Sequence, residues 1–253
     1  MRAPIPTPAQ CVDRARYALT SPGVRIVVFF LFPYAALLVG LDVAARYGEV
    51  TDQHLPVEFF LSQDRSFGEY LEYALMLSMA AMLLISGSRH SRKVYTIFGT
   101  LFLVLSADNA LELHEQLGDL FAVLMPATPG LAPHHVAESV VFACVGSILA
   151  AGLAIGFLDA DATSLIDAAI LTTLVAVIAF FGVAVDALTA MDNNTLAETQ
   201  VLAFIEDGGE FATIIVTFLT VIGIFERERQ FTRPPAINAA TTGKRLVAPP
   251  PAS

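Results

Sequence analysis

The chain has 253 residues, of which 55% are hydrophobic and 15% are charged, and its formal net charge at pH 7 is −10. A mean hydropathy of +0.65 is too high for a soluble domain of this length, and it favours a protein that crosses a membrane several times. No basic patch interleaved with aromatic residues occurs, so we do not expect nucleic-acid binding.

The first 23 residues precede the first long apolar run and include Arg14 and Arg16. They are predicted to form a cytoplasmic N-terminal segment. The apolar run from residue 24 to residue 45 is too long for the hydrophobic region of a signal peptide, and no small-residue cleavage site follows it closely. We therefore expect this run to be a retained membrane span.

Six apolar windows follow one another along the chain, each of about 20 residues, the length that a helix needs to cross a hydrocarbon core of about 30 Å. The windows cover residues 24–45, 67–87, 94–117, 135–158, 164–190 and 201–225. The sequence therefore predicts an all-α, polytopic membrane bundle of six transmembrane helices, with residues 24–226 as the transmembrane domain. The proline-containing segment 227–253 is predicted to be a disordered cytoplasmic tail.

The basic residues indicate how the bundle is oriented. Twelve of the 14 fall on one side of the predicted spans, namely Arg2, Arg14, Arg16, Arg25, Arg89, Arg92, Lys93, Arg227, Arg229, Arg233, Lys244 and Arg245. Arg46 and Arg65 fall on the other side. By the positive-inside rule, both termini are expected in the cytoplasm, in a multi-pass protein of the inner (plasma) membrane. Most of the acidic residues then lie toward the outer surface.

Acidic residues recur in three successive pairs of predicted helices. The first helix of each pair has an aspartate near its outer end, which is Asp42, Asp108 or Asp186. The second helix opens with an acidic residue or a histidine, two further residues and then a glutamate. These openings are Glu69 with Glu72, His135 with Glu138, and Asp207 with Glu210. The shared order and spacing predict three pseudo-repeated αα-hairpins around a threefold axis, with the acidic side chains directed inward.

A carboxylate inside a membrane span costs roughly 2.5–3.5 kcal/mol on insertion scales, so such residues usually have a partner and a task. On a continuous helix over residues 94–117, Asp108, Glu112 and Glu115 would share one face within about 60° of arc. The predicted metal ligands are Asp108, His114, Glu115, His135, Glu138, Asp207 and Glu210. Carboxylates combined with histidines favour a divalent transition metal, namely Zn, Fe or Mn.

The leading hypothesis is an integral membrane metalloprotein with an outward-facing site, in which the metal activates water or oxygen against a lipid or another membrane-embedded substrate. Glu72 or Glu112 would be the general base. Two alternatives stay open: a cation- or proton-coupled transporter or channel that uses the same carboxylates, and an accessory subunit of a membrane complex. A retinal protein is excluded, because the chain's lysines, Lys93 and Lys244, both lie outside the membrane windows.

Overall fold

The structure is a computed structural model that describes residues 7–61, 63, 65–90, 92–126, 132–158, 160–189 and 194–232. Within these residues all regular secondary structure is helical, and six segments are long and apolar enough to cross a membrane. The protein is therefore a multi-pass membrane protein, and the predicted fold class is confirmed. The helices, in chain order, are α1 (Pro8–Leu19), α2 (Pro22–Val50), α3 (Phe67–His90), α4 (Lys93–Leu111), α5 (Leu113–Phe121), α6 (Pro133–Gly156), α7 (Ala162–Ala179), α8 (Asp186–Thr189) and α9 (Leu196–Thr232).

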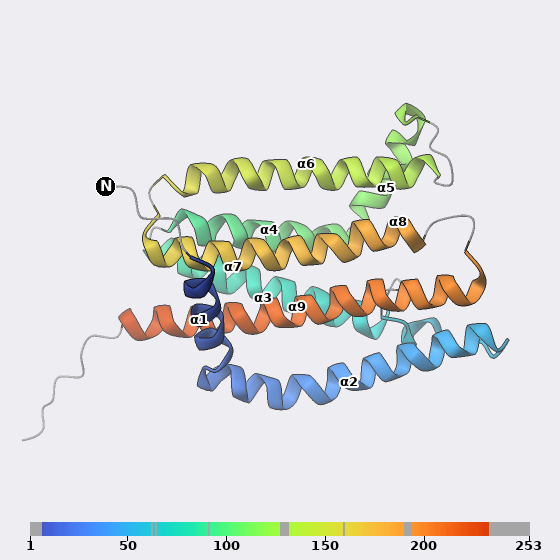
Figure 1. Ribbon diagram of the computed structural model, residues 1–253, viewed down its shortest axis with the longest axis horizontal. Helices are drawn as coiled ribbons and strands as arrows, with labels where there is room; N and C mark the ends of the chain where they lie inside the picture. Colours follow the sequence, from blue (N-terminus) through green and yellow to red (C-terminus); the bar gives the residue numbers. More distant parts are fainter. Residues whose placement is uncertain are drawn as a thin grey trace, which may run out of the picture.

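The long helices run side by side between two ends of the bundle (Figure 1). We call the end where α2, α4 and α8 finish and α3, α6 and α9 begin the acidic end, and the opposite end the basic end. A π-helix, η3 (Phe180–Val185), joins α7 to α8 within one spanning segment. Helix α9 continues through Thr232, so residues 227–232 of the predicted tail are helical, and residues 233–253 lie outside the described part of the chain.

The core lies where α3 and α4 pack against each other and α9 packs against α2, α3 and α7. Tyr95, Phe98 and Phe102 of α4 are fully buried there, together with Met79 and Leu83 of α3. Helix α6 lies at the edge of the bundle, in contact with α4 and α5. Many large apolar side chains face outward, and a bilayer would cover this surface without the cost that water imposes.

The most extensive helix contacts are between helices of different predicted hairpins rather than within one hairpin. Helices α3 and α4, which belong to different predicted pairs, make the most extensive contact, whereas α2 packs mainly against α9. The internal threefold repeat therefore stays a prediction.

The prediction of one continuous helix over residues 94–117 is wrong. Helix α4 ends at Leu111, and Glu112 adopts a left-handed conformation with φ 51° and ψ 37° before α5 begins. Side chains satisfy the carbonyl groups that the broken helix leaves free, because Gln116 Nε2 donates to Leu111 O at 2.8 Å and Tyr73 Oη donates to Asn109 O at 3.0 Å. Asp108 and the residues of α5 consequently do not share one helical face.

Candidate functional site

Three side chains at the acidic end converge in the manner of metal ligands. His135 and Glu138 of α6 and Asp186 of α8 each offer a ligand atom, and these three atoms lie within 4.8 Å of one another. This is the one group of histidine, cysteine or acidic residues that meets this distance in the described part of the chain. All three are partly buried, with exposed side-chain fractions of 27% for His135 and 15% for Glu138. We call them the ligand triad.

Local structure explains why the two residues of α6 lie together. Pro133 occupies the first turn of α6, where a missing backbone N–H costs nothing, and it fixes the helix start just before His135. The spacing of three residues then places Glu138 above His135, with His135 Nδ1 at 3.2 Å from Glu138 Oε2. Gly118 of α5 packs against this turn, and a Cβ there would lie 2.5 Å from Glu138 Cγ. Glycine at this position therefore lets α5 lie close against the ligand triad.

The π-helix η3 directly precedes the third member of the triad. A π-turn carries an extra residue and so changes the direction in which the residues after it face, and such turns are frequent at functional sites. Gly182 within η3 lies against α9, where a Cβ would be 3.1 Å from Glu210 Oε2. Gly209 of α9 allows the ring of Phe181 to occupy the space of its missing side chain. Close contact between η3 and α9 thus sets the position of Asp186.

A histidine–aspartate pair stands beside the triad. His114 Nδ1 lies 3.1 Å from Asp108 Oδ2, and the His114 ring packs on Phe142 of α6 at a centroid distance of 5.1 Å. Burial acts to lower the pKa of His114, but the hydrogen bond with Asp108 and the charges of Asp108, Glu115 and Glu138 outweigh it and raise the pKa above its ordinary value. The Nδ1 atom of His114 is thus occupied by Asp108, and His114 is not among the three residues whose ligand atoms converge in the triad.

A second cluster centres on Arg46 of α2. Its Nε donates to Asp42 Oδ2 at 2.8 Å, and its Nη2 forms an ion pair with Asp207 of α9. The other oxygen of Asp42 accepts the backbone N–H of Leu61 at 3.0 Å, and the Phe60 ring covers the guanidinium at 5.6 Å. Asp207, a predicted metal ligand, therefore forms an ion pair with Arg46, which lies 161 residues earlier in the sequence.

The other predicted site residues lie around these clusters. Glu72 is buried on α3, and Glu210 lies on α9 within electrostatic range of His114 and Asp186. Glu115 is half exposed, with its Oε1 at 3.9 Å from His114 Nε2. Glu112 forms the break between α4 and α5. Of the seven predicted ligands, the structure thus brings His135 and Glu138 into the triad, and it adds Asp186, which the repeat pattern marked but the predicted ligand set omitted.

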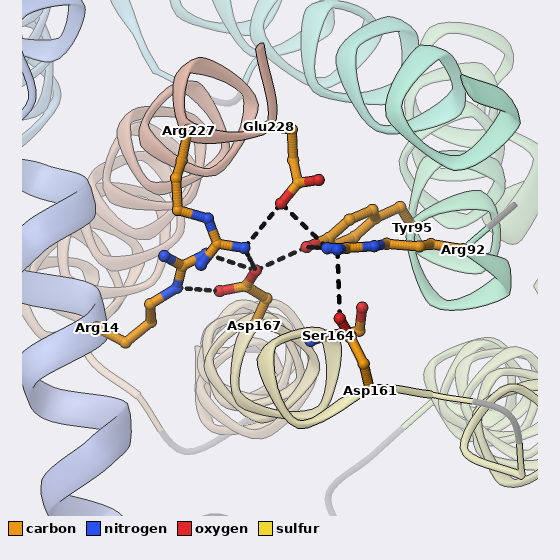
Figure 2. Close-up of polar contacts among 8 residues, drawn as sticks. All are labelled: Arg14, Arg92, Tyr95, Asp161, Ser164, Asp167, Arg227 and Glu228. Carbon is orange, nitrogen blue, oxygen red and sulfur yellow. Dashed lines mark hydrogen bonds and ion pairs between the residues drawn. The ribbon is translucent and has the colours of Figure 1, made fainter. Parts of the chain in front are cut away.

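The basic end holds a polar network that sequence reasoning did not identify (Figure 2). Its centre is Asp167 of α7, whose side chain is fully buried. Arg14 of α1 binds it through two hydrogen bonds of 2.6 and 2.8 Å, the Tyr95 hydroxyl donates to it at 2.7 Å, and Arg227 of α9 lies at 3.8 Å. The signal in the sequence was an aspartate inside the apolar run of α7. The network ties α1 to the bundle.

Arg92 extends this network to the start of α7. It lies 3.0 Å from Glu228 and 3.2 Å from Asp161, so three guanidinium groups face three carboxylates in Figure 2. Burial acts to raise the pKa of Asp161, but the hydrogen bond from the backbone N–H of Ser164 and the charges of Arg92 and Arg227 hold it below its ordinary value. The contact with Arg92 is therefore complete above the ordinary pKa of aspartate and is lost as the pH falls through the lowered value.

Comparison with known proteins gives one match. A family described as a domain of unknown function, DUF8692, matches residues 35–223. This range begins within α2 and ends within α9, so it includes the ligand triad and the Arg46 cluster but not α1 or Glu228. No curated protein and no solved structure matches the chain.

Proposed function

The chain belongs to the DUF8692 family, and we propose that it is a membrane metalloprotein in which His135, Glu138 and Asp186 bind one transition-metal ion. The observation that carries this proposal is the convergence of their ligand atoms within 4.8 Å. One imidazole and two carboxylates are a ligand set that Zn²⁺, Fe²⁺ and Mn²⁺ all accept. Three protein ligands leave a coordination position for water or substrate, which is typical of catalytic rather than structural metal sites.

The proposed reaction is metal-dependent hydrolysis or oxidation of a membrane-embedded substrate such as a lipid or quinone. The metal would lower the pKa of a bound water or polarise the bond to be broken. One feature supports a substrate from the bilayer, which is that all three side chains of the ligand triad are partly exposed.

A cation- or proton-coupled transporter is the second candidate, because buried acidic residues continue from the triad toward α3. Glu210 is in electrostatic range of Asp186, and Glu72 is in range of Glu210. A transport path would also have to cross the basic end, where the buried Asp167 and Glu228 are ion-paired with arginines. The one-sided position of the acidic clusters therefore favours the metalloprotein.

Metal binding should stabilise the folded protein in a way that depends on the triad. With free Zn²⁺ at 100 times its dissociation constant, linkage predicts about 2.7 kcal/mol of stabilisation, or roughly 5–10 °C in melting temperature. A chelator should remove this gain in the wild type. Lowering the pH should also reduce it, because the ligands must be deprotonated to bind the ion.

Thermal unfolding in detergent, with and without chelator, measures this effect. Asp186→Asn should abolish the chelator-dependent shift, and Glu198→Gln, at an exposed position near the start of α9, should retain it. Identical melting of the wild type with and without chelator would contradict the proposed metal site.

We also propose that both termini lie in the cytoplasm and that the triad opens to the outer surface, from the distribution of the basic residues. In a background that carries Cys11→Ser and Cys144→Ser, a single cysteine at the exposed position Val123 should react with an impermeant thiol reagent added outside intact cells. Cysteines at the exposed positions Arg89 and Ala162 should react after the cells are opened. The reverse pattern of labelling would invert the topology.

A further inference from the structure

Glu72 is a buried carboxyl group surrounded by other acids. Its exposed fraction is 8%, and it lies inside the spanning segment α3. Among the described residues no hydrogen bond to its side chain is formed, and the charged groups in electrostatic range are Glu210 and Asp207 of α9 and Glu69 of α3. A buried polar group without a partner is costly, and an isolated buried charge is more so.

Arg46, the arginine of the neighbouring cluster, forms its hydrogen bonds and ion pairs with residues other than Glu72. Arg46 directs Nε to Asp42, Nη2 to Asp207 and Nη1 to Gln200 at 3.4 Å. All three nitrogens of the guanidinium therefore have partners that are not Glu72. Phe60 and Leu61, which are 8% and 1% exposed, cover this cluster at the acidic end and keep it from open solvent.

The charged residues around Glu72 determine whether its carboxyl group is neutralised by a cation or by a proton. With Asp207 paired to Arg46, Glu72 and Glu210 remain as two carboxyl groups in range of each other. Glu210 also has His114 in range, a positively charged neighbour when its ring is protonated. In the described part of the chain, every charged neighbour of Glu72 is acidic. Two carboxylates that share a low-dielectric site cannot both stay ionised, so the group without a cationic neighbour takes up a proton.

We propose that Glu72 is a binding site for an exchangeable proton, and that Glu210 connects this site to the ligand triad. Transfer of the proton from a Glu72 oxygen to the Glu210 carboxylate leaves the total charge of the pair unchanged. Acidic side chains in series inside a membrane are typical of proton relays. The proton site of Glu72 stands without a metal, whereas its connection to the triad rests on the proposed function.

Infrared spectroscopy of the full chain in detergent tests the proton site directly. Metal-free wild-type protein at neutral pH should give a C=O stretching band of a protonated carboxyl group, and this band should shift in D₂O. Glu72→Gln should remove the band and Glu72→Asp should move its frequency, while the exposed control Glu198→Gln should leave it unchanged. A band that is absent from the wild type, or that persists unaltered in Glu72→Gln, would overturn the proposal.

Two further infrared measurements test the assignment of the proton to Glu72 and the connection of this site to the ligand triad. Glu210→Asp, which keeps an acid at this position, should leave the frequency of the band unchanged, and a frequency shift in that variant would place the proton on Glu210 and refute the assignment to Glu72. Addition of Zn²⁺ should shift the Glu72 band in the wild type but not in Asp186→Asn. If the wild type binds Zn²⁺ and the band does not respond, the connection fails. If no Zn²⁺ binds, the proposed metal site fails while the metal-free band still decides the proton site.

Discussion

Replacing His135 by alanine or Glu138 by glutamine should weaken Zn²⁺ binding by at least about 10- to 100-fold. Losses of this size are typical when a residue that only supports a metal ligand is replaced, and loss of a ligand itself should cost no less. Each change removes one of three ligand atoms that lie within 4.8 Å of one another. The remaining two atoms would hold the ion through fewer bonds, with water in the vacant position. Competition between the detergent-solubilised protein and a fluorescent chelator measures the change in affinity.

His134 provides a matched control for this experiment. It precedes His135 on α6, and the two rings lie 4.0 Å apart, but its nitrogens are not part of the ligand triad. His134→Ala should therefore retain Zn²⁺ affinity close to that of the wild type. If His134→Ala loses as much affinity as His135→Ala, or if neither variant loses any, the triad is not the binding site.

Replacing Asp167 by alanine should destabilise the protein by about 3–5 kcal/mol, because it removes one partner from a buried ion-paired network. Arg14 would lose both hydrogen bonds that hold α1 to α7, and the Tyr95 hydroxyl would lose its acceptor. Unfolding in a denaturing detergent titration measures the loss. The exposed Asp13 of α1 is the control, and Asp13→Ala should change stability by no more than about 0.5 kcal/mol.

A double-mutant cycle shows whether this loss comes from the contact with α1. Arg14→Ala alone should also destabilise, and the double variant with Asp167→Ala should lose less than the sum of the two single losses, because each change removes the same pair. Strict additivity would mean that Arg14 and Asp167 do not interact in the membrane protein. An Asp167→Ala variant as stable as the wild type would show that the network contributes nothing to the fold.

The fold was predictable because each membrane span can be identified from its own stretch of sequence. Each of the six spanning segments is an apolar run of suitable length, and no long-range contact is needed to identify it. The contact between His135 and Glu138 was predictable for the same reason, since a spacing of three residues places both on one helical face. The length of the apolar runs thus accounts for the six spans, and helical periodicity accounts for the contact between two of the three triad members.

The remaining features depend on contacts that the sequence does not display. The helix break at Glu112 is supported by hydrogen bonds from Gln116 of α5 and from Tyr73 of the neighbouring helix α3. The π-helix η3 precedes Asp186 and packs through Gly182 against Glu210 of α9. The Arg46–Asp207 pair joins residues 161 positions apart. The first two features depart from the regular α-helix on which the prediction rested, and the third is a contact between two regular helices that local sequence does not reveal.

The metal content of the protein as isolated from membranes tests the central claim most directly. Elemental analysis of the purified wild type should find close to one Zn, Fe or Mn ion per chain. The variant that combines His135→Ala, Glu138→Gln and Asp186→Asn should contain none of them, while it still elutes as a folded protein in size-exclusion chromatography. A folded wild type without stoichiometric transition metal, and without uptake when Zn²⁺, Fe²⁺ or Mn²⁺ is supplied, would contradict the assignment of the triad as a metal site.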